Sequence, residues 1–534
     1  MATAMDRQLR MKRVQQKFKM RGLTLTLDAV KAVLKHLEES DSSEDEALNL
    51  FLAEMDKVSL KSNMLSKDAI LEVLGSLAGN FVNEQNQLCI VDAFNVPRFC
   101  YDSIRKSFYR YTQKQSIHGE AQSKAALYRD RFQLLQQRVI RDKHFAKPAF
   151  GLAGSRTGAC EMIPLQSLLG SVGHQWVMGT ISQVEDGRFC LEDLTASVPI
   201  DFSEAISSSR WKSYFVHVYS GFFTENCVVV AEGDLQPNGV FKIHTLGFPP
   251  LESRGLSLSV TAGHDFFGAG ALNFDEIARL EQREKNATNY MFVILSEIWL
   301  DHEETMQKLS QVLTGFEQVD VVPSLFIFMG NFCSHPCNLA FNRFSELRSH
   351  FGRLGSMISE CPRIKQSSRF LFIPGPEDVG SANVLPRPPL PKYFTDEILK
   401  YIPNAEFGSN PCRIRFYAQE IVLIREDLIY RMRRSCIITP SEEETKDPFE
   451  HLVATVTHQS HLCPLPLTVQ PISWPYDHSL RLYPTPQTIV LADRLEQKVF
   501  KYAGVTSFSP GSFSNDGAFI AYRPATSEPE LSSI

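Results

Sequence analysis

The chain has 534 residues, more than one hydrophobic core usually serves, so two or three domains are expected. Hydrophobic residues make up 43% and charged residues 22%, which excludes a disordered or fibrous protein. The formal net charge is −6, whereas a protein that mainly grips a phosphate backbone is normally basic, so direct contact with nucleic acid is not assumed.

Residues 1–78 are predicted to form a small N-terminal helical domain, because apolar residues recur at helical spacing from Leu27 to Leu37 and again from Leu48 to Met55. Seven Lys and Arg residues and no acid lie between Arg7 and Arg21, a composition that mitochondrial transit peptides share. We favour the first helix of a folded domain, since residues 23–39 continue directly as an amphipathic helix without a Ser-rich stretch.

Residues 79–170 are expected to be connecting helices and linker. They begin with a short strand from Leu88 to Val91 and a helix rich in Arg, Lys and Tyr, and they include a long helix from Ala125 to Ile140. An OB-fold β-barrel is predicted for residues 171–285. Three short strands with an Asp-Gly turn precede a break, and two more strands follow it, which is the strand outline of that fold.

Many OB-folds bind single-stranded nucleic acid, so this alternative needs a test against charge. Between His174 and Pro250 there are nine acids against four bases, the wrong sign for a groove along a phosphate backbone. Six aromatic residues offer stacking surfaces but lack interleaved bases, so core or protein-interface roles are favoured for Trp211, Tyr214, Phe215, Tyr219, Phe222 and Phe223.

Residues 286–524 alternate apolar strands with helices, the pattern of an α/β sandwich, and residues 525–534 are predicted to be a disordered tail. Functional residues in such sheets lie at the carboxyl ends of the strands. The strands expected here are Met291–Leu295, Ser324–Met329, Phe370–Ile373, Ile414–Tyr417, Ile421–Ile424 and Thr488–Ala492.

The order of motifs after these strands resembles that of the calcineurin-like metallophosphoesterases, whose strand-end Asp, Asn and His residues hold two metal ions. Against that pattern, the expected ligand positions carry Glu297, Trp299, Asn331, Ser334, Pro376, Glu377 and Asp493. Proline has no side-chain donor or acceptor and indole only donates, so neither ligates a metal. We therefore predict a phosphoesterase-like sandwich with no catalytic residues, no metal and no cofactor.

An OB-fold before an inactive phosphoesterase domain resembles the B-subunit family of the eukaryotic replicative DNA polymerases. Residues 370–378 read Phe-Leu-Phe-Ile-Pro-Gly-Pro-Glu-Asp, close to that family's signature loop, here Pro374, Gly375, Pro376 and Asp378. Val379 stands where a further proline is usual. Within the family the epsilon branch matches best, on segments that include residues 18–23, 92–99, 366–370, 385–390, 410–414, 425–428 and 461–466.

The resemblance implies a non-catalytic scaffold in the nucleus. Its OB and phosphoesterase-like domains would hold the zinc-bearing C-terminal domain of the epsilon catalytic subunit, in a complex with small histone-fold subunits. The N-terminal domain would reach the replicative helicase through GINS, and DNA would be contacted only indirectly. In this interpretation the proline-rich loop from Pro374 to Pro391 is a rigid candidate contact.

Three enzyme or metal alternatives stay open. A rebuilt phosphoesterase site would use Glu297, Glu377, Asp378 and Asp493. Residues 333–337, Cys-Ser-His-Pro-Cys, are too crowded for tetrahedral zinc, and loop thiols are favoured. The group His458, His461, Asp477 and His478 is interpreted as core or surface rather than as a catalytic remnant.

The eleven cysteines are expected to be free thiols, and no apolar run is long enough to cross a membrane.

Overall fold

The structure is a computed structural model that describes residues 87–534, apart from 114, 146–159, 204–205, 208–220, 339–340, 381–382 and 441–444. Before residue 87 it describes positions 11, 12, 14, 16–20, 24–26, 29, 30, 33, 64, 65 and 70. The chain divides into two compact units, Met1–Gln87 and Leu88–Ile534.

The first unit contains two very short strands, β1 (Thr24–Leu25) and β2 (Met64–Leu65), which pair in parallel. The predicted helical domain did not include this pair. Val14 and Phe18 are buried on the helical segment around residues 11–20. Most apolar positions that carried the helical prediction, such as those between residues 34 and 55, lie outside the described residues.

The start of the second unit matches the prediction in part. The short predicted strand is confirmed as β3 (Leu88–Asp92), which belongs to a sheet built mainly from residues after 411. The predicted helix rich in Arg, Lys and Tyr is wrong, because β4 (Phe99–Asp102) and β5 (Ser107–Arg110) form a hairpin there. The long predicted helix is confirmed as α5 (Ala121–Arg141). The 3₁₀ turn η1 (Ala93–Asn95) lies between β3 and β4.

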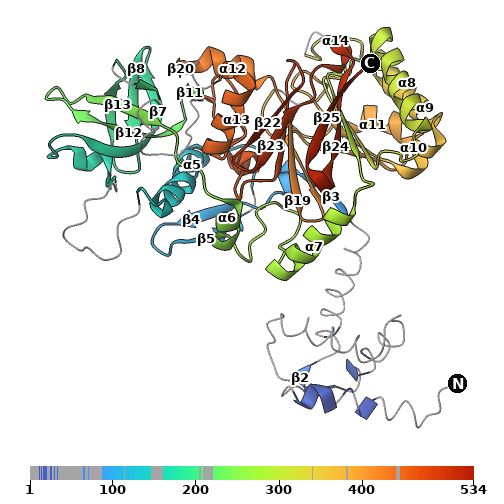
Figure 1. Ribbon diagram of the computed structural model, residues 1–534, viewed down its shortest axis with the longest axis horizontal. Helices are drawn as coiled ribbons and strands as arrows, with labels where there is room; N and C mark the ends of the chain where they lie inside the picture. Colours follow the sequence, from blue (N-terminus) through green and yellow to red (C-terminus); the bar gives the residue numbers. More distant parts are fainter. Residues whose placement is uncertain are drawn as a thin grey trace. The chain divides into compact units, whose positions relative to one another are not determined.

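The OB-fold is a closed barrel in the order β7-β8-β9-β13-β12-β7, in which only the β9–β13 pairing is parallel (Figure 1). The predicted strands are confirmed as β7 (Gln175–Glu185), β8 (Arg188–Glu192), β9 (Ser197–Asp201), β12 (Val228–Leu235) and β13 (Phe241–Gly247). Short additions are β6 (Met162–Ile163), η2 (Leu165–Leu168) and β10 (Ile206–Ser207). Helix α5 packs on the barrel through Phe132, Leu135 and Val139.

The sandwich consists of two six-stranded sheets. The first has the order β17 (Ala405–Phe407), β16 (Arg369–Ile373), β15 (Leu325–Met329), β14 (Phe292–Ser296), β24 (Ala518–Arg523) and β25 (Glu528–Ser533). The second has the order β22 (Lys498–Tyr502), β23 (Val505–Ser509), β21 (Thr488–Ala492), β19 (Gln419–Arg425), β18 (Cys412–Phe416) and β3.

Helices cover the outer faces of both sheets, which gives four layers (Figure 1). The first sheet carries α8 (Glu303–Gln318), α9 (Phe344–Ser359), α10 (Pro362–Ser367) and α11 (Lys392–Leu399). The second carries α12 (Leu428–Ser435) and α13 (Pro448–Gln459). The remaining elements are α6 (Arg254–Val260), α7 (Phe274–Asn286), α14 (Phe513–Asp516), η4 (Trp474–Leu480), η5 (Pro524–Thr526) and the pair β11 (Phe223–Thr224) with β20 (Cys436–Ile438).

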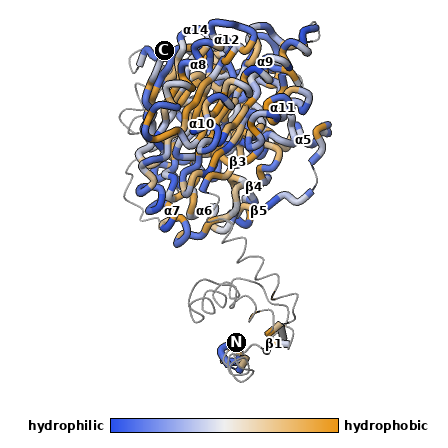
Figure 2. The backbone as a smooth tube through the Cα atoms, turned by 90° about the vertical axis from the view of Figure 1, so that its right-hand side faces the viewer, coloured by the Kyte–Doolittle hydropathy of each residue, from blue (hydrophilic) through white to orange (hydrophobic). Residues whose placement is uncertain are grey.

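The core between the sheets is apolar on both sides, because central strands buried on two faces are continuous hydrophobic runs such as Leu325–Met329. Figure 2 shows the hydrophobic positions gathered inside this unit, with hydrophilic ones outside. The last residues correct the predicted disordered tail: β25 pairs with β24 along its whole length.

Barrel and sandwich are joined by buried polar contacts. Gln459 at the end of α13 donates to the carbonyl of Val228 and accepts from its amide, both at 2.8 Å. Thr455 accepts from the amide of Phe222 at 2.8 Å. All eleven cysteines lie in the described part and carry free thiols, as predicted. Among the residues described, no helix combines the length and apolar composition that a membrane span requires.

Candidate functional site

The predicted positions lie where the carboxyl ends of strands from both sheets meet. In the first sheet β14, β15 and β16 are parallel and end at Ser296, Met329 and Ile373. In the second sheet β19 and β21 are parallel and end at Arg425 and Ala492. Arg425 Nε donates to the carbonyl oxygen of Gly330 at 2.9 Å, so the two edges are in direct contact.

Glu297 is the centre of this cluster. It is fully buried, and its backbone has a φ of +56°, an uncommon value for a residue with a side chain. Its Oε1 accepts from Asn331 Nδ2 at 2.9 Å, from the guanidinium of Arg425, and from Arg494 Nε at 3.2 Å. Its Oε2 accepts from the indole nitrogen of Trp299 at 2.8 Å.

These four donors decide what Glu297 is able to bind. A carboxylate offers about four lone-pair sites, and four side-chain donors already point at this one. Two of the donors are guanidinium groups, which bring the positive charge that a buried carboxylate needs. Three of them bond to Oε1, so a metal ion at this oxygen would have to displace at least one of them.

Asn331 and Glu377 complete the contact between strand ends. Asn331 Oδ1 accepts from the amide of Glu377 at 2.9 Å, and the Arg494 guanidinium donates to Glu377 Oε2. Arg494 thus joins the carboxylates that follow β14 and β16. It also lies 3.4 Å from Asp427, so the second sheet contributes a third acid to the same network.

Charge pairing keeps part of this network ionised. Burial alone would raise the pKa of Asp427, but Arg425 and Arg494 outweigh that effect and hold its pKa below the ordinary value. Burial would likewise lower the pKa of Arg425, but Glu297 and Asp427 raise it. Glu426, next in the chain, is almost fully buried, and burial raises its pKa to about 7 although Arg431 lies 3.0 Å away.

The signature loop is an internal structural element. Pro374, Gly375, Pro376 and Asp378 are all buried. Asp378 Oδ1 accepts from the amide of Phe332 at 2.6 Å and Oδ2 from the amide of Gly375 at 2.7 Å, while burial raises the pKa of Asp378 to about 6. A side chain at Gly375 would place Cβ 2.3 Å from Asn331 Oδ1, so glycine is required for this close approach.

This burial bears on the expectation that residues 374–391 form a contact surface. Buried Arg387 donates to the carbonyls of Pro376 and Asp378 and holds the loop from inside. Exposed positions in the described part of the loop are few and include Gly380, Asn383 and Pro388. The loop is therefore placed to hold the strand ends together rather than to present a broad contact surface.

Two predicted positions do not bond to Glu297. Ser334 is paired with Asp301, which accepts from the Ser334 amide at 2.9 Å and from its hydroxyl at 2.6 Å. Asp493 accepts from the amide of Ile429 at 3.1 Å, and burial, with the charge of Asp427, raises its pKa. The structure thus brings together Glu297, Trp299, Asn331 and Glu377 but gives Ser334 and Asp493 other partners.

The two arginines are the residues that sequence reasoning missed as members of the site. Arg425 and Arg494 follow apolar strands of the second sheet, as Glu297 and Asn331 follow strands of the first. A basic residue at the end of a buried strand was the available clue. The metal-ligand pattern does not include arginine, so it gave no reason to place either residue in the site.

The other candidates have structural surroundings. His458 bonds to the carbonyl of Pro249 at 2.8 Å and to the Tyr502 hydroxyl at 2.7 Å, and burial lowers its pKa to about 4. His461 Nε2 lies 3.2 Å from Asp477, which also accepts from Arg131 of α5. These side chains connect α5, the barrel and the sandwich inside the unit, so of the two predicted roles, core or surface, the structure shows the core.

The thiols of the Cys-Ser-His-Pro-Cys segment and the barrel aromatics complete the comparison. Cys333 is buried, with Sγ 3.4 Å from an Asp301 oxygen. Phe222 and Phe223 are 3% exposed, and Phe223 stacks on Phe248 with ring centroids 4.3 Å apart, so these two belong to the core. The other four aromatic candidates, at positions 211, 214, 215 and 219, lie outside the described residues.

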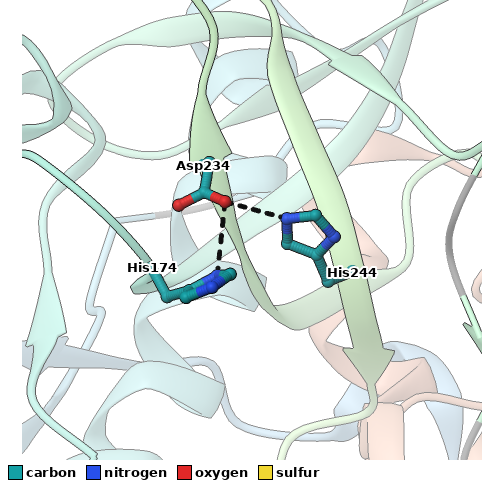
Figure 3. Close-up of side chains that lie close together, drawn as sticks. All are labelled: His174, Asp234 and His244. Atoms are coloured by element: carbon teal, nitrogen blue, oxygen red, sulfur yellow. Dashed lines mark hydrogen bonds and ion pairs between the residues drawn. The ribbon is translucent and has the colours of Figure 1, made fainter.

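One group with metal-ligand geometry lies on the barrel and was missed from the sequence. His174, Asp234 and His244 have ligand atoms within 4.8 Å of one another (Figure 3). It is the only such group of His, Cys, Asp or Glu found in the part of the chain that the structure describes. It lies on β12, β13 and the residue before β7, so it is distinct from the strand-end cluster of the sandwich.

Comparison with known proteins covers almost the whole chain. Three family models match: the N-terminal domain of DNA polymerases epsilon over residues 5–74, the OB-fold domain of DNA polymerase epsilon subunit 2-like proteins over 121–250, and the B subunit of DNA polymerases alpha and epsilon over 292–500. The DNA polymerase epsilon B subunit of Arabidopsis thaliana is 53% identical over 530 residues, covering 98% of each chain. The human DNA polymerase epsilon subunit 2 is 34% identical and covers 97% of each chain.

A solved archaeal phosphodiesterase covers 46% of this chain and 99% of its own at 8% identity with a TM-score of 0.24, too low to carry an argument. The assignment to a family therefore rests on the sequence relatives and the family models, which agree with the resemblance found from the motifs. The chain belongs to the family of DNA polymerase epsilon B subunits, also called subunit 2.

Proposed function

We propose that this chain is a non-catalytic accessory subunit of the DNA polymerase epsilon complex, acting as a scaffold in chromosomal replication in the nucleus. The observation that carries the proposal is the set of four hydrogen bonds to the Glu297 carboxylate. Its oxygens accept from Arg425, Arg494, Asn331 and Trp299. The names of its relatives support membership of such a complex.

The chemistry of the cluster supports a structural role. Two-metal hydrolysis needs an open metal position where water ionises to hydroxide. A guanidinium only donates hydrogen bonds and stays protonated, so it cannot supply that nucleophile. Arg425 is 0% exposed and held by Glu297, Asp427 and Gly330, which fixes it as an internal counter-charge.

We assign the barrel and sandwich together as the platform for the catalytic subunit, through its zinc-bearing C-terminal domain. The buried contacts of Gln459 and Thr455 with the barrel favour this assignment, because a platform whose two domains are already fixed loses less entropy on docking. Residues 1–78 are assigned to the helicase side through GINS, and the small histone-fold subunits to the same complex.

The test is co-purification of the full chain with the C-terminal domain of the epsilon catalytic subunit, beside the corresponding domains of the alpha and delta polymerases. We expect stable association with the epsilon domain alone. Equal association with all three would contradict the assignment to epsilon, and no association with any would contradict the platform role.

A second measurement addresses catalysis. The purified full chain is incubated with Mn²⁺ and a chromogenic phosphodiester, beside the Asp493→Ala variant. We expect no turnover by either protein. Turnover that Asp493→Ala abolishes would establish a rebuilt phosphoesterase site and refute the non-catalytic proposal.

The charge of the barrel argues against the remaining alternative, direct binding of single-stranded DNA. An excess of five acids between His174 and Pro250 repels a phosphate backbone. We expect the full chain to bind oligonucleotides only at the level of a non-specific acidic protein. Tight binding that weakens steeply with salt would contradict the indirect role in DNA contact.

A further inference from the structure

The His174–Asp234–His244 group is built from adjacent strands of the barrel. Gln175 of β7 pairs with Gly233 of β12, so the preceding His174 lies across from Asp234. His244 lies on β13, the other neighbour of β12. Figure 3 shows both imidazole rings directed at the carboxylate of Asp234 between them.

A β-bulge sets the position of His244. Along β12 and β13, Glu232 pairs with Thr245 and the next residue, Gly233, pairs with Ile243, so His244 is the extra residue of the ladder. A Cβ at Gly233 would lie 2.1 Å from the carbonyl oxygen of Lys242, so glycine permits this close approach. Bulges of this kind redirect a side chain, and this one places His244 within reach of Asp234.

The two separations from Asp234 to the histidines are close to those in a tetrahedral metal site. With metal–ligand bonds of about 2.0–2.2 Å, ligand atoms in a tetrahedral zinc site lie roughly 3.3 Å apart. Asp234 Oδ2 is 3.3 Å from His174 Nδ1 and 2.9 Å from His244 Nε2. The ring centroids are 5.2 Å apart at an interplanar angle of 72°, so the rings approach edge to face and do not block each other.

A second observation concerns the other carboxylate oxygen. Asp234 Oδ1 is buried and has no hydrogen-bond partner within the described part of the chain, so this carboxylate has unused acceptor capacity. The side chain of His174 is 65% exposed, which leaves a path for an ion and room for water as a fourth ligand. The acidic barrel favours a cation, although Lys242 pairs across from Asp234 and opposes it.

We propose that His174, Asp234 and His244 bind one divalent transition-metal ion, with Zn²⁺ as the expected ion because two imidazoles and a carboxylate suit it. The site ties together the three strands β7, β12 and β13. This inference does not depend on the proposed scaffold function, since it rests only on contacts within the barrel.

The experiment uses the metal-free full chain titrated with Co²⁺ as a spectroscopic probe and then with Zn²⁺ in competition. We expect one tight equivalent with the visible absorption of tetrahedral Co²⁺ and without the sulfur charge-transfer band that cysteine ligands would give. Zn²⁺ should also raise the thermal unfolding midpoint, because a ligand that binds only the folded state stabilises it.

Three variants define the ligands. His174→Ala and His244→Ala should each weaken the Co²⁺ site by at least about 100-fold, since removing a ligand costs no less than removing its supporting partner. His118→Ala, an exposed histidine elsewhere, should leave the site unchanged. Circular dichroism of each variant verifies that the barrel is folded.

Three outcomes would overturn the proposal. One is the absence of a stoichiometric site in the wild-type chain, which would make the group an ion-pair cluster only. Another is full metal binding by the folded double variant His174→Ala/His244→Ala. The third is a sulfur charge-transfer band, which would place the ion at cysteines instead.

Discussion

Arg425 provides a direct test of whether the strand-end cluster is held by internal counter-charges. The change is Arg425→Met, which removes the guanidinium and fills a similar volume. In the wild type this group bonds to Glu297, to Asp427 at 2.9 Å and to the carbonyl of Gly330 at 2.9 Å, and it is 0% exposed. The variant leaves Glu297 buried, with Arg494 as its only remaining cation among the described residues.

The expected cost follows from the burial of the pair. Removing one partner of a buried ion pair typically destabilises a protein by about 3–5 kcal/mol, because the other charge stays buried and uncompensated. Arg494 still contacts Glu297, but its side chain is 43% exposed, so we expect the lower half of that range. For a unit as large as Leu88–Ile534, with an unfolding entropy of about 2.1 cal/mol/K per residue, about 3 kcal/mol lowers the thermal unfolding midpoint by roughly 3 °C.

The assay is thermal unfolding of the full chain by circular dichroism and tryptophan fluorescence, since Trp299 lies in the cluster. The matched control is Arg353→Met, because Arg353 makes an exposed double contact with Glu303 on the helical surface. Exposed pairs contribute about 0–1 kcal/mol, so the control should shift little.

A double variant isolates the charge effect. Glu297→Gln in the Arg425→Met background removes the uncompensated charge and should recover about 1–3 kcal/mol of the loss. If Arg425→Met costs no more than Arg353→Met, or if the double variant recovers nothing, Arg425 is not the counter-charge of this cluster.

Three further predictions concern other parts of the second unit. His458 has a folded pKa of about 4, below the ordinary 6.5, so its stabilising contribution is complete above pH 6.5 and is lost as the pH falls toward 4. His458→Gln should therefore reduce the loss of unfolding free energy between pH 7 and 5 by about 2 kcal/mol. A loss equal to that of the wild type would contradict this. Gln459→Glu cannot donate to the β12 carbonyl and should cost about 1–3 kcal/mol, measured as faster hydrogen exchange in β12, whereas wild-type protection would refute the domain contact. Gly330→Ala places Cβ 1.9 Å from Asp378 Oδ2 and should lower the free energy of chemical unfolding by more than about 1–3 kcal/mol. The control is Gly315→Ala in α8, which should not lower it, because a Cβ there has no other atom within 4 Å.

The central strands could be predicted from the sequence because they are buried on both faces. Runs such as 325–329 and 488–492 contain no charge and have a length typical of strands, so local pattern and tertiary position agree. The OB barrel was predictable for a related reason, since its turns carry Asp-Gly and Asn-Gly pairs that mark the strand ends. Local signals of this kind require no knowledge of distant partners.

The features that the sequence did not reveal depend on distant partners. Strand β3 was predicted as a strand, but it pairs with β18, more than three hundred residues later, so its membership of the sandwich has no local signature. Strand β25 contains Pro529 and exposed polar residues, which are typical of a tail, yet it pairs with β24 as an edge strand. Arg425 and Arg494 meet Glu297 only through the contact of two sheets.

The same dependence explains why the candidate site was predicted in part. Loss of metal ligands was visible in the sequence, because Trp299 and Pro376 cannot bind metal. The positive charge that pairs with Glu297 in place of a metal ion was not visible, because Arg425 and Arg494 come from the opposite sheet. The sequence therefore indicated what the cluster lacks, and the fold identified what stabilises the carboxylates that remain.

This arrangement gives the acids a physical role at a site proposed to have no catalysis. Glu297 and Glu377 follow different strands and both bond to Arg494, while Glu297 and Asp427 come from different sheets and both bond to Arg425. Each guanidinium is a planar donor with fixed directions, so it joins the acids only when the strand ends are in register. Replacing Glu297 alone would leave buried Arg425 with Asp427 as its only acidic partner among the described residues. The cluster thereby fixes the edge-to-edge contact of the two sheets, which a platform for a partner protein requires more than it requires a reactive water.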